Sequence, residues 1–253
     1  MTMTRRSPGT RGLILLAAFL ILFSLRSFSQ QRDDASVIRG IDASVTARED
    51  HLIGYTATEH YVVYRNGDQQ HPAAEMYVKT TYHSDTGKTY QILSETGSVL
   101  LRKQLLERML DSEKTVTQPA IRRTALINST NYDMAVKGTA TQDGRPGLVM
   151  EIAPRRISPY LFKGQIWVDA QDYSIVRLEG ITSKSPTVFA SPTQVSRQYR
   201  MVNGFPMATH ATASTAIFLV GQTTIAIDYT NYVLQVAANS TSHPAPAETK
   251  PAN

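Results

Sequence analysis

The fold class is decided by two adjacent stretches, Leu161-Phe-Lys-Gly-Gln-Ile-Trp-Val-Asp169 and Tyr173-Ser-Ile-Val-Arg-Leu-Glu-Gly180. In the first stretch, Phe162, Ile166 and Val168 alternate with residues of a second face that is largely polar. Successive side chains of a strand point to opposite faces, so this pattern predicts a β-hairpin with one face against apolar material. That material is either the protein's own core or a bound apolar ligand, and the choice between them decides the function.

Similar stretches with strand character surround this hairpin. We expect further strands over residues 55–65, 75–83, 88–95, 132–141, 148–153, 194–202, 205–220 and 222–236. Several end at turn sequences such as Asn66-Gly67 and Asn203-Gly204, which supply the positive backbone dihedrals that tight hairpins need. About ten strands joined mostly by short turns favour antiparallel neighbours, so the sequence predicts a meander.

Two segments carry apolar residues at the three- and four-residue spacings of a helix, residues 33–53 and 98–114. Gly40 weakens the first prediction, and a short helix is expected near Pro119. A long meander has exposed edges and tends to curl, often around a helix. We therefore expect one mainly β (α+β) domain over residues 30–236, a curved sheet with a helical cover.

Both ends of the chain are expected to lie outside this domain. Arg5, Arg6 and Arg11 precede an uncharged, mostly apolar run from residue 12 to residue 25, which is short for a membrane span and typical of a secretory signal. An uncleaved signal anchor is the alternative. We expect residues 1–29 to be a signal peptide, the exported protein to be periplasmic, and residues 237–253, rich in Ala, Ser, Thr and Pro, to be a disordered tail.

Charge and cysteine content exclude several classes of function. The chain has 26 basic and 21 acidic residues, and four of the arginines lie in the leader, so the mature part has 26 − 4 = 22 basic residues and a net charge of about +1. Nucleic-acid binding normally needs a basic field over one face, and no nucleic-acid partner is expected. The absence of cysteine excludes disulfides, thiolate metal sites, a cysteine nucleophile and lipid attachment through cysteine.

The sequence carries no recognisable catalytic motif. The six histidines do not fall at metal-ligand spacings from one another or from nearby carboxylates. A nucleophile elbow, a phosphate loop and a dinucleotide-binding fingerprint are all absent. We therefore assign no catalytic residue, metal ligand or cofactor, and expect a protein that is not an enzyme.

Apolar side chains of the predicted strands and of the helix 98–114 are the candidate ligand contacts. They either pack as an ordinary core or line a concave cavity, and methionine and aromatic linings suit lipid chains because they adapt to varied shapes. Alternation alone does not distinguish the two. The candidates for an apolar cleft are Val63, Tyr77, Leu101, Leu105, Phe162, Ile166, Val168, Ile175, Met201, Met207 and Ile225.

The hairpin 161–180, together with Gly144-Arg-Pro-Gly-Leu-Val-Met-Glu-Ile-Ala-Pro154, Gly204-Phe-Pro206 and Ile225-Ala-Ile-Asp-Tyr-Thr-Asn-Tyr232, resembles the LolA/LolB-like superfamily of periplasmic lipoprotein carriers, especially its exported lipoprotein-sorting members. The resemblance covers roughly residues 35–236 in the order of the elements and about 131–232 by motif. It implies a half-open antiparallel β-barrel, closed by helices, whose concave apolar face holds acyl chains. It transfers no individual functional residue, because the lid arginine and the acyl-contacting tryptophan of the well-studied carriers have no counterpart here.

Three functions remain open from the sequence. The first is a non-enzymatic carrier or binder of lipid or acylated lipoprotein, which would exchange its cargo with a membrane-bound donor or acceptor protein. The second is an envelope-stress sensor or protein-interaction module of the same fold. The third is a secreted hydrolase, which has the least support because no catalytic constellation is present.

Overall fold

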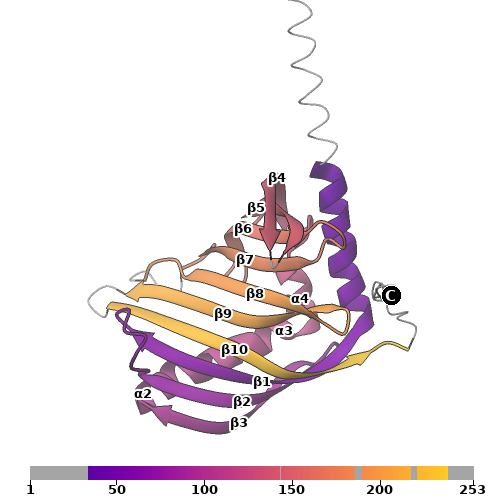
Figure 1. Cartoon of the computed structure of the whole chain (residues 1–253). Coiled ribbons are helices and arrows are strands. Elements are labelled where there is room, and N and C mark those ends of the chain that lie inside the picture. Colours follow the sequence, from indigo (N-terminus) through magenta and orange to yellow (C-terminus); the bar gives the residue numbers. More distant parts are fainter. Residues whose placement is uncertain (1–33, 143, 186–189, 218–220, 239–253) are drawn as a thin grey trace, which may run out of the picture.

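The computed structural model describes residues 34–142, 144–185, 190–217 and 221–238 (Figure 1). The expected signal peptide and nearly all of the expected C-terminal tail lie outside these ranges. The described residues form ten antiparallel strands in one sheet, in the order β3-β2-β1-β10-β9-β8-β7-β6-β5-β4. The strands are β1 (Leu52–Arg65), β2 (Ala74–His83), β3 (Gly87–Gly97), β4 (Tyr132–Gln142), β5 (Arg145–Pro154), β6 (Phe162–Asp169), β7 (Ile175–Thr182), β8 (Gln194–Val202), β9 (Phe205–Ile217) and β10 (Gly221–Val236).

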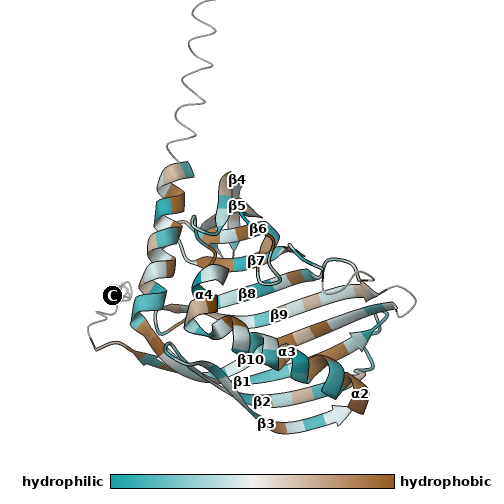
Figure 2. Ribbon diagram, turned by 180° about the vertical axis from the view of Figure 1, so that it is seen from behind, coloured by the Kyte–Doolittle hydropathy of each residue, from teal (hydrophilic) through white to brown (hydrophobic). Residues whose placement is uncertain are grey.

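The sheet is curved and open, since its two edge strands, β3 and β4, do not pair with each other. Helices lie against its concave side: a helix over residues 34–51, then α2 (Val99–Leu101), the π-helical turn η1 (Arg102–Leu106), α3 (Glu107–Thr117) and α4 (Pro119–Ala125). Figure 2 shows α3 and α4 in front of the sheet. The predicted mainly β fold, a half-open antiparallel barrel with a helical cover, is confirmed.

The strand order departs from a simple meander at one point. Strands β3-β2-β1 and β4 to β10 each follow the chain, but the two series meet where β1 pairs with β10, for example Tyr61 opposite Ile227. The segment between β3 and β4 is helical and too long for a hairpin turn. It carries the chain across the concave side from one edge of the sheet to the other (Figures 1 and 2). The predicted meander is therefore two meanders joined by the first and last strands.

The half of the concave face formed by β1, β2 and β10 is filled by side chains of η1 and α3. Leu106 and Leu110 are buried there against the three strands, and Leu101, Leu105 and Met109 pack beside them. Residues 98–114 were expected to be one helix, and the structure continues it through a π-helical turn to Thr117. Ser98 caps its start by accepting a hydrogen bond from the backbone N–H of Leu101.

The helix over residues 34–51 covers the other half, formed by β5, β6 and β7. Ile41 is fully buried against a cluster that includes Met150, Ile166 and Leu178. Gly40, which weakened the sequence prediction of this helix, has a packing role. A Cβ at this position would lie 2.5 Å from the ring of Tyr173, so glycine lets that ring contact the helix backbone. Within the described ranges, no helix combines the length and apolarity needed to cross a bilayer.

Candidate ligand-binding cleft

A cleft of about 250 Å³ lies between the helix 34–51 and strands β6 to β9. Its position follows from the fold, because α3 fills one half of the concave face and the helix 34–51 covers the other half. Strands β6 and β7 direct Phe162, Ile175 and Leu178 into the cleft. The remaining apolar walls come from the helix, the end of α4, the segment after it and β9, and they are Val45, Ala125, Leu126, Ile127 and Pro206.

Polar contacts fix the helical wall of the cleft. Arg122 of α4 donates from Nε to the Glu49 carboxylate at 2.7 Å and from Nη1 to the backbone oxygen of Ser84 at 2.8 Å. In the middle of the helix, Asp42 accepts from the backbone N–H and the hydroxyl of Ser129 at 2.8 and 2.6 Å. The helix is therefore tied to α4 and to the segment before β4, and the cleft has a defined width.

One cationic side chain of the sheet enters this cleft. Arg197 of β8 pairs across the sheet with Leu178 and Ala211, which are both buried on the concave side, and it lines the cleft together with Tyr199. Burial by itself lowers the pKa of Arg197, but Tyr229, Tyr199 and Glu113 outweigh this effect and raise the pKa well above its ordinary value. The guanidinium is therefore charged.

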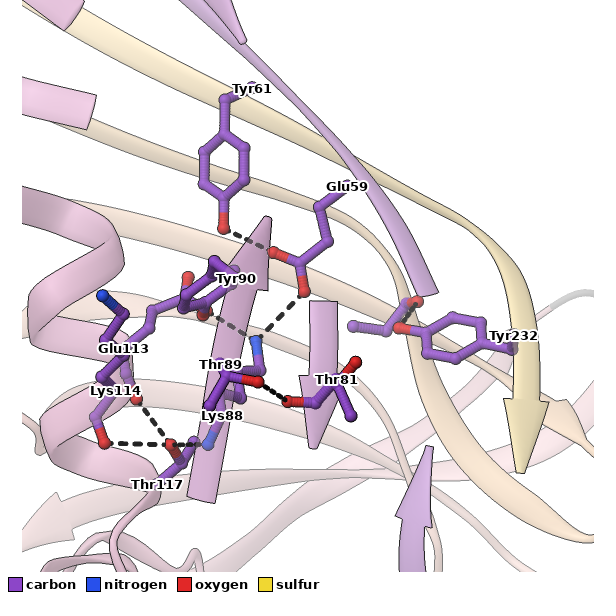
Figure 3. Close-up of polar contacts among 11 residues, drawn as sticks. Glu59, Tyr61, Thr81, Lys88, Thr89, Tyr90, Glu113, Lys114, Thr117 and Tyr232 are labelled. Carbon is purple, nitrogen blue, oxygen red and sulfur yellow. Dashed lines mark hydrogen bonds and ion pairs between the residues drawn. The ribbon is translucent and has the colours of Figure 1, made fainter. Parts of the chain in front are cut away.

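A buried ionic network lies next to the cleft, beneath α3 (Figure 3). Glu59 of β1 is completely buried and accepts a hydrogen bond from the hydroxyl of Tyr61. The Nζ of Lys88 lies 3.2 Å from the Glu59 carboxylate and 2.6 Å from that of Glu113 on α3. Tyr90 donates to the same Glu113 oxygen at 2.8 Å. The network joins β1 and β3 to the helical cover, because a buried carboxylate is stable only when it is paired.

The pKa of Glu113 gives a prediction about acid stability. Burial by itself raises this pKa, but the ammonium of Lys88 and the guanidinium of Arg197 outweigh burial and lower it below the ordinary 4.5. A lowered pKa in the folded state means that the ionised carboxylate stabilises the fold fully above about pH 4.5, and that this contribution is lost as the pH falls through the folded pKa. We expect Glu113→Gln to be less stable than the wild type at neutral pH, with a difference that shrinks below pH 4.5.

Urea unfolding of both proteins across this pH range measures the difference. Glu107→Gln, on the same helix but facing solvent beside Lys103, is the matched control and should show little pH-dependent difference. A constant difference between Glu113→Gln and the wild type from neutral pH to pH 3 would contradict the assigned role of Glu113.

The structure separates the candidate residues into several environments. Phe162 and Ile175 line the cleft, and Ile166 and Val168 are completely buried in the cluster beside it. Val63, Leu101, Leu105 and Ile225 pack together between the sheet and the helical cover, and Met207 belongs to a separate buried cluster with Leu52 and Tyr55. Tyr77 is 40% exposed on the opposite face of β2, where its ring stacks on His60. Met201 is 41% exposed and borders a smaller hollow of about 130 Å³ near Trp167.

Sequence reasoning missed the charged residues of the concave face. Glu59, Lys88 and Arg197 occupy positions that face inward in their strands, and the alternation of their neighbours was the signal that could have identified them. A charged residue in phase with a buried apolar series is unusual, because an isolated buried charge is costly. Glu113 carried no such signal, since its partners come from distant strands.

Two other observations limit the chemistry of the described residues. A hollow of about 460 Å³ over β6 to β9 is wider than the cleft, but its lining is mostly polar or glycine, including Gln165, Glu179 and Ser196. Its apolar side chains are Ile181 and Val195, fewer than those that line the cleft. In the part of the chain that the structure describes, no three His, Asp or Glu side chains gather in a group that could hold a metal ion.

The sequence matches no protein-family model and no curated protein. In structure, the chain is similar to a LolA superfamily protein from Nitrosomonas europaea, with 10% identity, a TM-score of 0.45, and coverage of 80% of this chain and 93% of that chain. It is also similar to a DUF1329 family protein from Desulfovibrio piger (12% identity, TM-score 0.40, 79% and 93% covered). A third similar structure, from Vibrio parahaemolyticus, is described as an outer membrane lipoprotein-sorting protein domain (11% identity, TM-score 0.42, 77% and 91% covered).

Proposed function

We propose that this chain is a periplasmic binder or carrier of an acyl chain, either of a lipid or of an acylated protein, and that the cleft beside the helix 34–51 is its binding site. The observation that carries the proposal is the lining of the cleft. Its walls are formed by Val45, Phe162, Ile175 and Leu178, which leave an apolar space unfilled by the protein's own side chains. The basic and apolar leader at the start of the sequence supports export.

The size of the cleft sets the affinity that an alkyl chain can reach. A volume of 250 Å³ holds about eight groups of the size of a methylene, if each takes roughly the 30 Å³ of a water molecule. Sheltering each methylene contributes about 0.8 kcal/mol, and ordering the chain and the side chains around it offsets part of the total. The gross gain of about 6 kcal/mol corresponds to a dissociation constant of roughly tens of micromolar, and the ordering costs move the expected value toward the millimolar range.

Blocking the cleft should remove binding. Ile175→Trp places a larger side chain in the cleft, and we expect saturable uptake of a fluorescent fatty acid by the delipidated protein to weaken at least tenfold. Fluorescence titration measures the change, and thermal unfolding checks that the variant remains folded. Ile181→Trp is the matched control, because Ile181 is on the same strand, is 40% exposed and lies outside the cleft.

Two results would count against the proposed function. The first is a wild-type protein, freed of endogenous lipid, that shows no saturable uptake. The second is equal binding by Ile175→Trp and Ile181→Trp, which would place the ligand elsewhere on the molecule.

A further inference from the structure

The cleft contains a charge that an alkyl chain does not need. Arg197 stands among apolar residues of the concave face, with Leu178 on one neighbouring strand and Ala211 on the other. Removing a guanidinium from bulk water is costly unless an anion or several hydrogen-bond acceptors compensate for it. A partly buried arginine that lines an apolar cleft therefore needs a partner.

The carboxylates near Arg197 are already engaged with other groups. Glu113 is bound by Lys88 and Tyr90, and Glu49 at the rim of the cleft is bound by Arg122 and lies 3.6 Å from Arg48. Arg197 itself makes no ion pair within 4.0 Å with any carboxylate of the described residues. Glu113 acts on it only through the electrostatic field at longer range.

Tyr199 supplies a second polar group at the same place. It lies two residues further along β8, lines the same cleft, and helps to raise the pKa of the Arg197 guanidinium. A guanidinium only donates hydrogen bonds and a phenol O–H can also donate one, so both side chains can bind the same acceptor. Arginine matches the planar fork of a carboxylate and also binds phosphate oxygens. Together the two side chains place a cation and a hydrogen-bond donor in the lining of the apolar cleft.

We propose that the natural ligand is an anionic amphiphile, with a carboxylate or phosphate head bound by Arg197 and Tyr199 and an alkyl tail lying against Phe162, Ile175 and Val45. This inference rests on the proposed function, because it names the class of ligand for the same cleft. A tail longer than about eight carbons would extend through the open side of the half-barrel.

The competing explanation is that Arg197 only balances the charge of the buried network. Glu59 and Glu113 carry two negative charges and Lys88 carries one positive charge, so a second cation nearby makes this interior neutral. A purely structural arginine would give the cleft no preference for the head group of its ligand. Head-group preference therefore separates the two explanations.

The test compares ligands that share one tail. Calorimetric titrations of the delipidated wild-type protein with 1-decanol, decanoate and decyl phosphate, at neutral pH and monomeric concentrations, report the contribution of the head group. We expect at least one of the two anions to bind tenfold or more tightly than decanol, and the tighter anion identifies the head as carboxylate or phosphate. Arg197→Met should abolish this preference while the affinity for decanol changes less than threefold. Arg200→Met, at an exposed position of the same strand, should keep the preference.

The outcomes separate this inference from the function on which it rests. Equal affinity of the wild type for decanol and both anions overturns the anionic head group and leaves an acyl-binding cleft intact. No binding of any decyl compound overturns both proposals. If Arg197→Met does not fold, the wild-type comparison still decides, and Arg197→Lys, which keeps the charge but loses the planar fork, should retain only part of the preference.

Discussion

Lys88→Met is expected to lower the free energy of unfolding by about 3–5 kcal/mol, which is the cost of leaving a buried carboxylate without its partner. Lys88 contacts two carboxylates, and one of them, Glu59, is completely buried. After the substitution, Glu59 keeps only the hydroxyl of Tyr61, and Glu113 keeps only that of Tyr90. Methionine preserves much of the volume of lysine, so the loss is electrostatic. Guanidinium unfolding monitored by circular dichroism measures it.

Two further variants make this interpretation specific. Lys88→Met leaves both Glu59 and Glu113 without Lys88, and the double variant Glu59→Gln, Lys88→Met removes the more deeply buried of these two charges. The two changes together should therefore cost clearly less than the sum of the single changes. Lys103→Met, which removes an exposed lysine paired with Glu107, should leave the unfolding midpoint nearly unchanged. A midpoint for Lys88→Met as close to the wild type as that of Lys103→Met would show that the network does not stabilise the fold.

The strands were predictable because their signals are local. Alternation placed a strand over residues 194–202, where the structure has β8 (Gln194–Val202), and it placed Phe162, Ile166 and Val168 on the inward face of the hairpin, as observed. Asn203-Gly204 marked the turn between β8 and β9, and both residues have positive φ there. Period-two patterning and turn chemistry involve only neighbouring residues, so a single sequence displays them.

The pairing of β1 with β10 was not predictable in the same way. Tyr61 pairs with Ile227 across most of the length of the chain, and no local pattern specifies which distant strand becomes the neighbour. The ionic network has the same origin, because β1, β3 and α3 bring Glu59, Lys88 and Glu113 together only after that pairing and the helical crossing are fixed. The crossing segment could be recognised as helical from sequence, but its path over the concave face could not.

The cleft shows the same limit for the candidate residues. Val63 and Ile175 occupy equivalent inward positions in their strands, and alternation treats them alike. In the structure Val63 is completely buried in the cluster that Leu106 and Leu110 of the cover complete, whereas Ile175 borders open space under the helix 34–51. How far each helix stands from the sheet decides which apolar side chains fill a core and which line a cleft. That distance depends on contacts such as the ion pair between Glu49 and Arg122, two residues that are far apart in the sequence.

Gly164→Ala is the second substitution with a large expected effect, a loss of about 2–3 kcal/mol of stability, at the upper end of what overpacking costs. Gly164 of β6 faces Gly180 of β7 on the concave side, where the two strands come so close that a Cβ at position 164 would overlap the carbonyl oxygen of Glu179 and lie 2.5 Å from the Cα of Gly180. These are backbone atoms in a paired strand, so they cannot move aside as a flexible side chain would. The clash is removed only if β6 and β7 move apart. That movement weakens the backbone hydrogen bonds between the two strands and the packing of Ile166 on Leu178.

Gly138→Ala is the matched control for this effect. Gly138 lies in the edge strand β4 next to a bulge, and a Cβ there would have no atom within 4 Å. Alanine should therefore be neutral or slightly stabilising at this position, because it restricts the unfolded chain without creating a clash. Gly180→Ala should act in the same direction as Gly164→Ala, since its Cβ would lie 2.6 Å from the carbonyl oxygen of Lys163. Equal unfolding midpoints for Gly164→Ala and Gly138→Ala would mean that the two strands separate readily, and that the close glycine pair does not hold this part of the sheet in place.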